Sequence, residues 1–469
     1  SSSFTQAYGS YKDFKYMCQE AILYRNAAQC KTDTKTNFTN KPFRFTDDDI
    51  AYLRWHPITA TMADCLGTQV YRDWLALEND PSANISLAGK WAPRFGSDLF
   101  GPTATLLTEY VVPEGKNWLQ TAKNHKTNAT VLRSKAQLKI KTFYRKRLAK
   151  LNHHLNTVQV KQCEGKWSEI DFAKDVTSVT MARQKAAFLR GGDKQAKQGD
   201  LVGSMDRVKC QQNLKAHIEK AQSGEAVIKG KMVGLADFVS ESYTLRNEDA
   251  SSSPLVSILN QQWVDGSSRI GPLKDMIPMV DTSGSMSFDS SYPLCTAIGL
   301  GIRIAEKSKL GKRVLTFSSV PRWVNLSTAP DFHSCVKVVS EAEWGHNTDF
   351  YAALKCILDA AKQSALSSEE VAKLTLVVLS DMQMDEAGQF DTDSPLFTNI
   401  AKEFADTGIQ VSGMPWEVPK IVFWNLKKTK GFPSKKDDTN AIMVSGGSDM
   451  ILNDLCENGV KAFDNVTPS

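Results

Sequence analysis

The C-terminal half of the chain alternates short apolar runs with longer amphipathic segments. The run 374–379 is almost wholly apolar, as expected of a strand that is covered on both faces of a sheet. In the segment 293–308, apolar residues recur at helical spacing. The pattern predicts strands at 276–280, 313–317, 322–326, 374–379, 420–424 and 441–445, and helices at 293–308, 350–361, 398–406 and 450–455. Strands that alternate with helices indicate a doubly wound, mostly parallel sheet.

The N-terminal half carries many helical signals and few strand signals. Thr46 followed by three acids is typical of a helix start, because acids are favourable against the helix dipole. Gly-rich 191–199 and Ser/Pro-rich 251–254 interrupt the pattern. We therefore predict an α plus α/β protein, with a helical, partly basic region over 1–250, a linker and lead-in over 251–270, and a sheet domain over 271–469.

Oxygen-bearing side chains stand where three predicted strand-helix units begin or end. Asp281, Ser283 and Ser285 follow an apolar strand directly, Thr348 precedes a helix, and Asp381 follows the longest apolar run. Carboxylates and hydroxyls are ligands that suit a hard cation such as Mg²⁺. In doubly wound sheets, ligands lie beyond the carboxyl ends of the strands, so we expect these donors to meet at one edge.

The spacing and order of these residues resemble the metal-ion-dependent adhesion site of the von Willebrand factor A domain. The resemblance implies that Ser283, Ser285 and Thr348 coordinate Mg²⁺ or Mn²⁺ directly. It implies partly water-mediated contacts for Asp281 and Asp381. One coordination position is then left for an acidic group from a protein partner.

Three alternatives stay open at this point. An Asp-x-Ser-x-Ser run is also typical of a capped helix start, in which these side chains accept from backbone N–H groups. Asp349 is a rival to Thr348 as the metal ligand. A domain of this kind can also fold around an empty site.

Five blocks resemble the domain-of-unknown-function 2828 family, which occurs in plants, fungi and large DNA viruses. They are ISLAGKWAPR at 85–94, YRKRL at 144–148, WSEIDF at 167–172, AFLR at 187–190 and LNQQW at 259–263. The resemblance covers most of the chain from about Leu87 onward. A helical region followed by an A domain is also similar in layout to the Ro autoantigen family. That second resemblance implies helical repeats and RNA binding.

The segment 116–161 is strongly basic, with twelve Lys or Arg and no Asp or Glu, whereas the rest of the chain has 45 bases and 52 acids. Such a segment makes a positive field that attracts polyanions. The candidate nucleic-acid-binding residues are Lys135, Lys139, Lys141, Arg145, Lys146, Arg147 and Lys150. The alternatives are a solvated helix face backed by buried apolar residues (Leu138, Ile140, Leu148, Leu151, Leu155 and Val158) and a surface for an acidic protein.

Other sequence features exclude several classes of protein. No apolar run approaches the ~20 residues that span a bilayer, and the start of the chain lacks a signal segment, so we expect no membrane partner and a cytoplasmic location, or a virion if the source is viral. No phosphate-binding loop, nucleophile elbow or zinc-protease helix occurs. His346 is the candidate general base beside the predicted metal loop, and no activating partner is visible. We therefore expect no enzymatic activity.

Two hypotheses for the function follow. The first is a metal-dependent binding or scaffold protein that joins a larger complex through an acidic protein ligand, RNA or both. The second is a structural assembly component, for example of a viral particle, in which the A-like domain makes protein–protein contacts.

Overall fold

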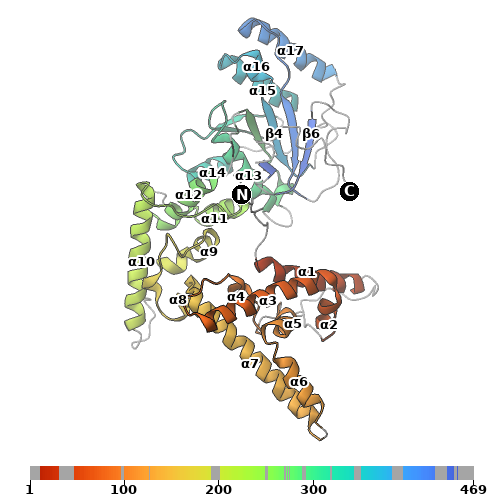
Figure 1. Cartoon of the computed structure of the whole chain (residues 1–469). Coiled ribbons are helices and arrows are strands. Elements are labelled where there is room, and N and C mark those ends of the chain that lie inside the picture. The colour runs from red at the N-terminus through yellow and green to blue at the C-terminus, as the bar shows by residue number, and fades with distance from the viewer. Residues whose placement is uncertain are drawn as a thin grey trace, which may run out of the picture. The chain divides into compact units, whose positions relative to one another are not determined.

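The chain divides into two compact units, Ser1–Lys166 and Trp167–Ser469, here called the N-terminal and C-terminal units. Figure 1 shows the computed structural model and the order of its elements. The structure describes residues 11–30, 47–96, 100–125, 127–191, 201–248, 252–268, 271, 273, 275–287, 292–316, 320–342, 350–382, 395–427, 441–447 and 451–452. Among these residues, no helix is long and apolar enough to cross a membrane.

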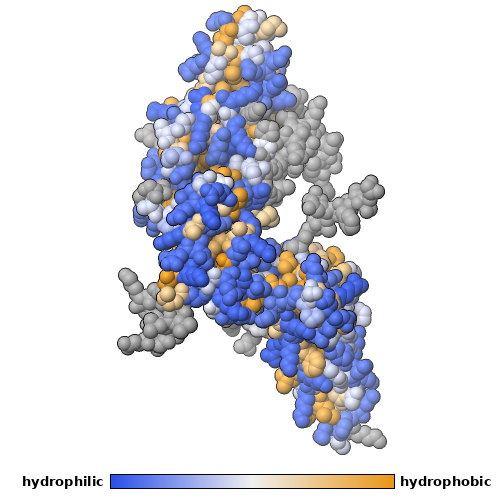
Figure 2. Space-filling model, turned by 60° about the vertical axis from the view of Figure 1, so that its left-hand side comes forward, coloured by the Kyte–Doolittle hydropathy of each residue, from blue (hydrophilic) through white to orange (hydrophobic). Residues whose placement is uncertain are grey.

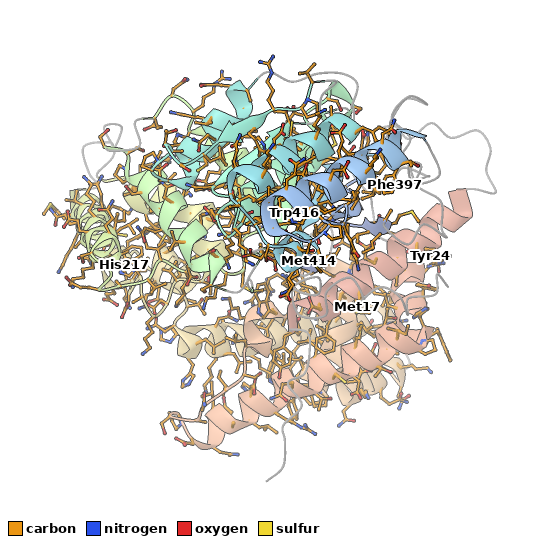
Figure 3. The ribbon with its side chains drawn as sticks, turned by 90° about the horizontal axis from the view of Figure 1, so that it is seen from above. Met17, Tyr24, His217, Phe397, Met414 and Trp416 are labelled. Atoms are coloured by element: carbon orange, nitrogen blue, oxygen red, sulfur yellow. The ribbon has the colours of Figure 1, made fainter. Side chains whose placement is uncertain are left out.

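The N-terminal unit is helical throughout its described part, as the sequence predicts. Its helices are α1 Tyr11–Cys30, α2 Asp47–Trp55, α3 Pro57–Asn79, α4 Ala88–Trp91, α5 Gly101–Val111, α6 Gly115–Lys123, α7 Ala129–Leu155 and α8 Val158–Cys163. One apolar core joins α3, α5 and α7 through buried residues such as Leu66, Leu107 and Leu148. Figure 3 labels Met17 and Tyr24 on α1, where both side chains are exposed.

The 27-residue helix α7 forms a hairpin with α6. The two helices approach closely at Gly115, where a Cβ atom would lie 2.7 Å from Ile140 Cγ1. Asn156 caps the C-terminal end of α7, and its φ of 43° is in the left-handed region that Asn tolerates better than most residues. The hairpin therefore holds one long side of α7 against protein and leaves the other side exposed.

Three described helices of the predicted N-terminal region, and a fourth that occupies most of the predicted linker, belong to the C-terminal unit instead. They are α9 Ser178–Leu189, α10 Leu201–Gln222, α11 Leu235–Thr244 and α12 Pro254–Ser267. Phe238 of α11 and Trp263 of α12 share an apolar core with Val280 of the sheet. The contacts therefore divide the chain at 166/167, whereas the predicted linker, 251–270, lies mostly within α12.

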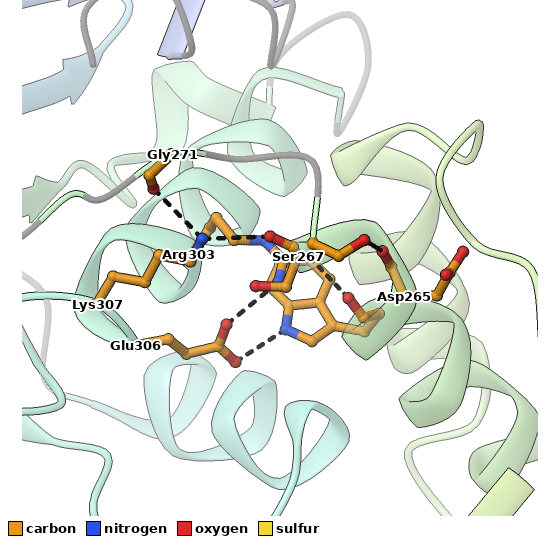
Figure 4. Close-up of polar contacts among 8 residues, drawn as sticks. Asp265, Ser267, Gly271, Arg303, Glu306 and Lys307 are labelled. Atoms are coloured by element: carbon orange, nitrogen blue, oxygen red, sulfur yellow. Dashed lines mark hydrogen bonds and ion pairs between the residues drawn. The ribbon is translucent and has the colours of Figure 1, made fainter. Parts of the chain in front are cut away.

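A buried polar network ties α12 to the helix that follows the first strand, α13 Tyr292–Ala305 (Figure 4). Arg303 is 1% exposed, and its guanidinium carbon lies 3.5 Å from the centroid of the Trp263 ring. Its Nη2 donates to the Trp263 carbonyl at 3.0 Å. Glu306 accepts from Trp263 Nε1 at 2.8 Å and from Arg303 Nη1 at 3.2 Å. A tryptophan that is anchored in this way makes α12 part of the sheet domain.

The C-terminal unit contains the predicted doubly wound, mostly parallel sheet. Its six strands lie in the order β3-β2-β1-β4-β5-β6, and β3 alone among them runs antiparallel to its neighbour. The strands are β1 Met276–Val280, β2 Arg313–Thr316, β3 Trp323–Asn325, β4 Thr375–Ser380, β5 Lys420–Asn425 and β6 Ala441–Ser445. Each predicted strand is thus present, with ends that differ by two residues or fewer.

Helices cover both faces of this sheet. In β4, Val377 and Leu379 enter one apolar cluster, and Leu376 and Val378 enter another, because successive side chains of a strand point to opposite faces. The described covering helices are α13, α14 Phe332–Glu341, α15 Phe350–Gln363, α16 Ser368–Val371 and α17 Pro395–Ser412. Helices α14 and α16 were not predicted from the sequence, and of the predicted last helix the structure describes only Ile451 and Leu452.

Two local contacts fix helices close to the sheet. Gly301 lets α13 lie against β1, because a Cβ atom there would be 2.4 Å from Val280 Cγ2. Beyond the end of α17, Trp416 is 2% exposed and donates from Nε1 to Ser412 Oγ at 3.0 Å (Figure 3). The first contact lies at the last residue of β1, directly before the residues of the candidate site.

Candidate metal centre and basic surface

Asp281 is the first residue beyond β1, and three interactions hold it. Its backbone N–H donates to the Leu379 carbonyl of β4 at 3.0 Å, which continues the pairing of the two parallel strands. Ser283 N–H donates to Oδ1 at 2.8 Å, and Ser380 Oγ donates to Oδ2 at 2.6 Å. The side chain is 1% exposed. The carboxylate is therefore fixed before any ligand arrives.

The two hydroxyls of the Asp-x-Ser-x-Ser run lie together. Ser283 Oγ and Ser285 Oγ are 2.9 Å apart and share a hydrogen bond. Ser285 belongs to a 3₁₀ turn, Gly284–Ser287, and the neighbouring Met286 is fully buried in the core. Burial of this methionine anchors the turn, so that both hydroxyls stay beside the end of β1.

Asp381 brings a second carboxylate to the same edge. It follows β4, which pairs with β1, and its side chain is fully buried. Burial raises the pKa of Asp281, and the charge of Asp381 raises it further, whereas hydrogen bonds from Ser380 and Ser283 lower it. A buried carboxylate whose charged form is opposed by burial and by a second acid is one that a bound cation would stabilise.

The donors present fit a hard divalent cation. Two carboxylates and two hydroxyls supply only oxygen, which suits Mg²⁺ or Mn²⁺ better than it suits softer metals. The described residues contain no group of three or more His, Cys, Asp or Glu that could hold a metal, so the site depends on its mixture of acids and hydroxyls. Thr348, its rival Asp349 and His346 lie outside the described residues.

Two further polar residues at this edge were not found from the sequence. Ser380 holds the Asp281 carboxylate, and Lys427 lies beyond β5 with Nζ 4.0 Å from Asp381 Oδ2. Both stand at the carboxyl ends of strands that neighbour one another in the sheet. A search of the residues at the end of every predicted strand, for basic side chains as well as for oxygen donors, could therefore have found both residues.

The structure leaves six of the seven candidate nucleic-acid-binding side chains of α7 exposed: Lys135, Lys139, Lys141, Arg145, Lys146 and Lys150. At 100° per residue, Lys135, Lys139 and Lys146 fall within about 40° of one another around the helix axis, and so form one stripe. Lys150 continues that stripe and pairs with Glu78 at 2.6 Å. Figure 2 shows how hydrophilic side chains dominate the visible surface.

Arg147 is the seventh candidate, and it is buried. Its guanidinium carbon lies 3.7 Å from the centroid of the Trp74 ring, and it forms an ion pair with Glu114. It also donates to the Val111 carbonyl. With a side chain only 7% exposed, Arg147 has no part in an exposed basic surface.

The residues behind the basic stripe match the expected apolar backing in part. Ile140, Leu148, Leu151 and Val158 are buried, Leu155 is partly exposed, and Leu138 is 61% exposed. A helix of 3.6 residues per turn explains the exception, since Leu138 lies about 160° from Ile140 around the axis.

The aromatic side chains near the stripe differ in how far their rings are accessible for stacking on a base. Lys139 Nζ lies 3.9 Å from the centroid of the Trp118 ring, and Phe143 packs edge-on against the same ring at 5.1 Å. Trp118 and Phe143 are partly exposed. Tyr144 is fully buried and donates its hydroxyl to the Pro93 carbonyl at 2.9 Å, so it cannot stack on a base.

Two family models match the chain. The model described as "Domain of unknown function (DUF2828)" matches residues 11–198, and "Domain of unknown function (DUF7788)" matches residues 275–466. The resemblance to DUF2828 is confirmed. The match starts earlier than Leu87 and ends at 198. The strands of the sheet lie within the residues that the second model matches, and the block at 259–263 lies between the two matches.

Two similar proteins extend this comparison. Uncharacterized protein L728 of Acanthamoeba polyphaga mimivirus is 26% identical over 425 residues, which cover 87% of this chain and 64% of that protein. The chain thus spans about two thirds of the length of this viral relative. The Ro (RSR) protein of Deinococcus radiodurans has a TM-score of 0.32 and 13% identity, with coverage of 98% of this chain and 95% of that chain.

Proposed function

We propose that this chain is a non-enzymatic binding protein whose C-terminal unit holds Mg²⁺ or Mn²⁺ and uses it to bind an acidic group of a protein partner. The observation that carries the proposal is the meeting of Asp281, Ser283, Ser285 and Asp381 at one edge of the sheet. Thr348 is the fifth proposed ligand. When bound, the cation would supply a coordination position for a carboxylate from the partner.

The arrangement favours binding over catalysis. Asp281 is held by Ser380 and Ser283, so its oxygens are committed to hydrogen bonds and coordination and are poorly placed to exchange protons with a substrate. General base catalysis needs a group within hydrogen-bond reach of the proton that it abstracts. The described donors at this edge supply fixed charge, which serves recognition.

The metal site is tested with the substitution Asp281→Asn, which keeps the shape of the side chain and removes its charge. Mn²⁺ is titrated into chelator-treated full-length protein in a calorimeter. We expect one binding event for the wild type and none for the variant, and unchanged binding for Asp359→Asn, which alters an exposed acid of α15. Equal heats for the wild type and Asp281→Asn would contradict the proposal.

A second candidate function, RNA binding by the N-terminal unit, is favoured by the exposed stripe of Lys135, Lys139 and Lys146. Its bases stand on one line of a helix, and Trp118 offers a partly exposed ring beside Lys139. Proteins usually bind single-stranded nucleic acid with basic side chains along its phosphate backbone and aromatic rings on which its bases stack.

Charge reversal tests this candidate. The triple variant Lys135→Glu, Lys139→Glu, Lys146→Glu should lose affinity for a labelled single-stranded RNA in an anisotropy titration at low salt. A matched reversal of three exposed lysines of α10 (Lys209, Lys215 and Lys220) should bind like the wild type. Equal losses in the two variants would mean that total charge alone matters, and no binding by the wild type would remove this candidate.

A structural role in an assembly, such as a virus particle, is the competing proposal. The similarity to a viral protein supports this proposal. We propose that the protein is located in the cytoplasm, or in a virion if its source is viral. Light scattering distinguishes the two proposals, because assembly that proceeds after nuclease and chelator treatment supports the structural role, whereas assembly that needs RNA or metal supports the binding role.

A further inference from the structure

The two acids of the candidate metal centre are so deeply buried that their ionised forms need a positive charge nearby. Asp281 is 1% exposed and Asp381 is fully buried. The cost of burying ionised carboxylates is high unless each is paired or hydrogen-bonded. In the absence of a metal, part of that positive charge has to come from the protein.

Lys427 supplies such a charge from the next strand of the sheet. Its Nζ lies 4.0 Å from Asp381 Oδ2 and donates to the Ser285 carbonyl at 3.2 Å. The ammonium therefore touches both halves of the site, the acid after β4 and the turn after β1. Its side chain is 22% exposed, so the ammonium has a way out to solvent.

The backbone around Lys427 is ordered by the end of β5. Leu426 N–H donates to the Ser380 carbonyl at 3.0 Å, which extends the pairing of β5 with β4. Asn425, which is 1% exposed, accepts at Oδ1 from Lys427 N–H at 2.9 Å. These bonds fix the backbone of Lys427 at the rim of the site, so a movement of its ammonium needs only a change of side-chain rotamer.

We propose that the Lys427 ammonium is a built-in competitor of the metal ion. It offsets part of the negative charge of the two buried acids in the metal-free protein, from its position beside Asp381, and moves away when a divalent cation is coordinated. A singly charged and a doubly charged cation that approach the same carboxylate repel each other, and more strongly at a buried site than in water. Lys427 thereby sets the metal affinity. This inference rests on the proposed metal-binding function and adds a regulator to the same site.

The test compares Lys427→Met, which removes the charge and keeps most of the side-chain volume, with Lys427→Arg, which keeps the charge. Lys420→Met is the matched control, because it removes an exposed lysine from the other end of the same strand. Mn²⁺ is titrated into chelator-treated full-length protein in each case. We expect Lys427→Met to bind on the order of tenfold more tightly than the wild type, since the repulsion is only partly screened. Lys427→Arg and Lys420→Met should stay close to the wild type.

A second measurement addresses the metal-free state. Thermal unfolding in excess chelator should begin at a lower temperature for Lys427→Met than for the wild type, because the paired acids lose a counter-charge. Addition of Mn²⁺ should raise the unfolding temperature of the variant by more than that of the wild type. If Lys427→Met does not fold in chelator, Lys427→Gln, whose side chain keeps a hydrogen-bond donor, takes its place in both measurements.

The outcomes separate this inference from the metal-binding proposal. Metal binding by the wild type with equal or weaker binding by Lys427→Met overturns the competitor and leaves the metal site in place. Binding by neither protein overturns both. Binding by Lys427→Met alone, abolished when Asp281→Asn is added, supports the competitor in its strongest form and overturns metal-dependent function for the native chain.

Discussion

The charged side chains of the two candidate sites differ in their exposure to solvent. At the end of the sheet, Asp281 and Asp381 are buried and each is held by named partners. On helix α7, Lys135, Lys139 and Lys146 are exposed to solvent. Buried, fixed charges give geometry and selectivity, whereas exposed charges give a field that salt screens. The first arrangement suits one small cation, and the second suits a long polyanion.

Arg147 is the exception on α7, and it gives the largest expected effect. Arg147→Met should lower the free energy of unfolding by about 3 kcal/mol, below the upper range for buried pairs because Glu114 is 32% exposed and can be rehydrated. The variant also loses the contact with the Trp74 ring. Urea unfolding followed by circular dichroism measures the change.

The control is Lys146→Met, the neighbouring but exposed base, for which we expect a change within about 0.5 kcal/mol. If both variants lose the same stability, the division of α7 into buried and exposed bases does not hold.

Metal should stabilise the C-terminal unit and leave the N-terminal unit unaffected. A ligand at a hundredfold excess over its Kd adds about 2.7 kcal/mol to the free energy of unfolding. Mg²⁺ should thus raise the unfolding temperature of the sheet domain, and excess chelator should reverse the shift. Differential scanning calorimetry of the full chain records both units at once.

Asp281→Asn should remove the metal-induced shift. A shift of the same size in this variant would place the bound cation elsewhere in the molecule.

A buried imidazole makes the stability of the C-terminal unit depend on pH. His333 is fully buried and shares a hydrogen bond of 2.8 Å with Ser242 Oγ. Burial lowers its pKa below the usual value of 6.5, and Lys337 lowers it further. The unfolded chain therefore binds more protons at this residue than the folded chain, so stability is lost as the pH falls below 6.5.

One such group contributes at most about 1.4 kcal/mol per pH unit. His333→Gln should flatten the dependence of unfolding free energy on pH between neutral and mildly acidic conditions. His153→Gln, which alters a side chain that is 77% exposed, is the control. An unchanged slope in His333→Gln would assign the acid sensitivity to other groups.

The smallest expected effect concerns a single base of the exposed stripe. Lys139→Gln should weaken RNA binding a few-fold at low salt and lower the dependence of log affinity on log salt by roughly 0.7, the value for one phosphate contact with a single strand. Anisotropy titrations over a series of salt concentrations give this slope. Lys215→Gln on α10 should leave the slope unchanged, and a change there of the same size would mean that the stripe is not a distinct surface.

The sequence determined the order and type of most elements of this protein. Periodicity acts over a few residues, so β1, α13, β4, α15 and β5 could be predicted from the chain alone. The Asp-x-Ser-x-Ser run was visible for the same reason, because its hydroxyls and carboxylate lie within one turn. Short helices such as α16 escaped notice because four residues hold too little pattern.

Only the tertiary structure showed the contacts between residues that are far apart in the sequence. Ser380 meets Asp281 across 99 positions, and Lys427 meets Ser285 across 142. Contacts between Trp263 and Arg303 hold α12 against the sheet domain, and the Ser- and Pro-rich composition before α12 does not predict this packing. Arg147 looks like its basic neighbours in sequence, and only the facing Trp74 and Glu114 place it inside. Local composition sets what a segment can become, whereas burial and pairing are settled by what folds against it.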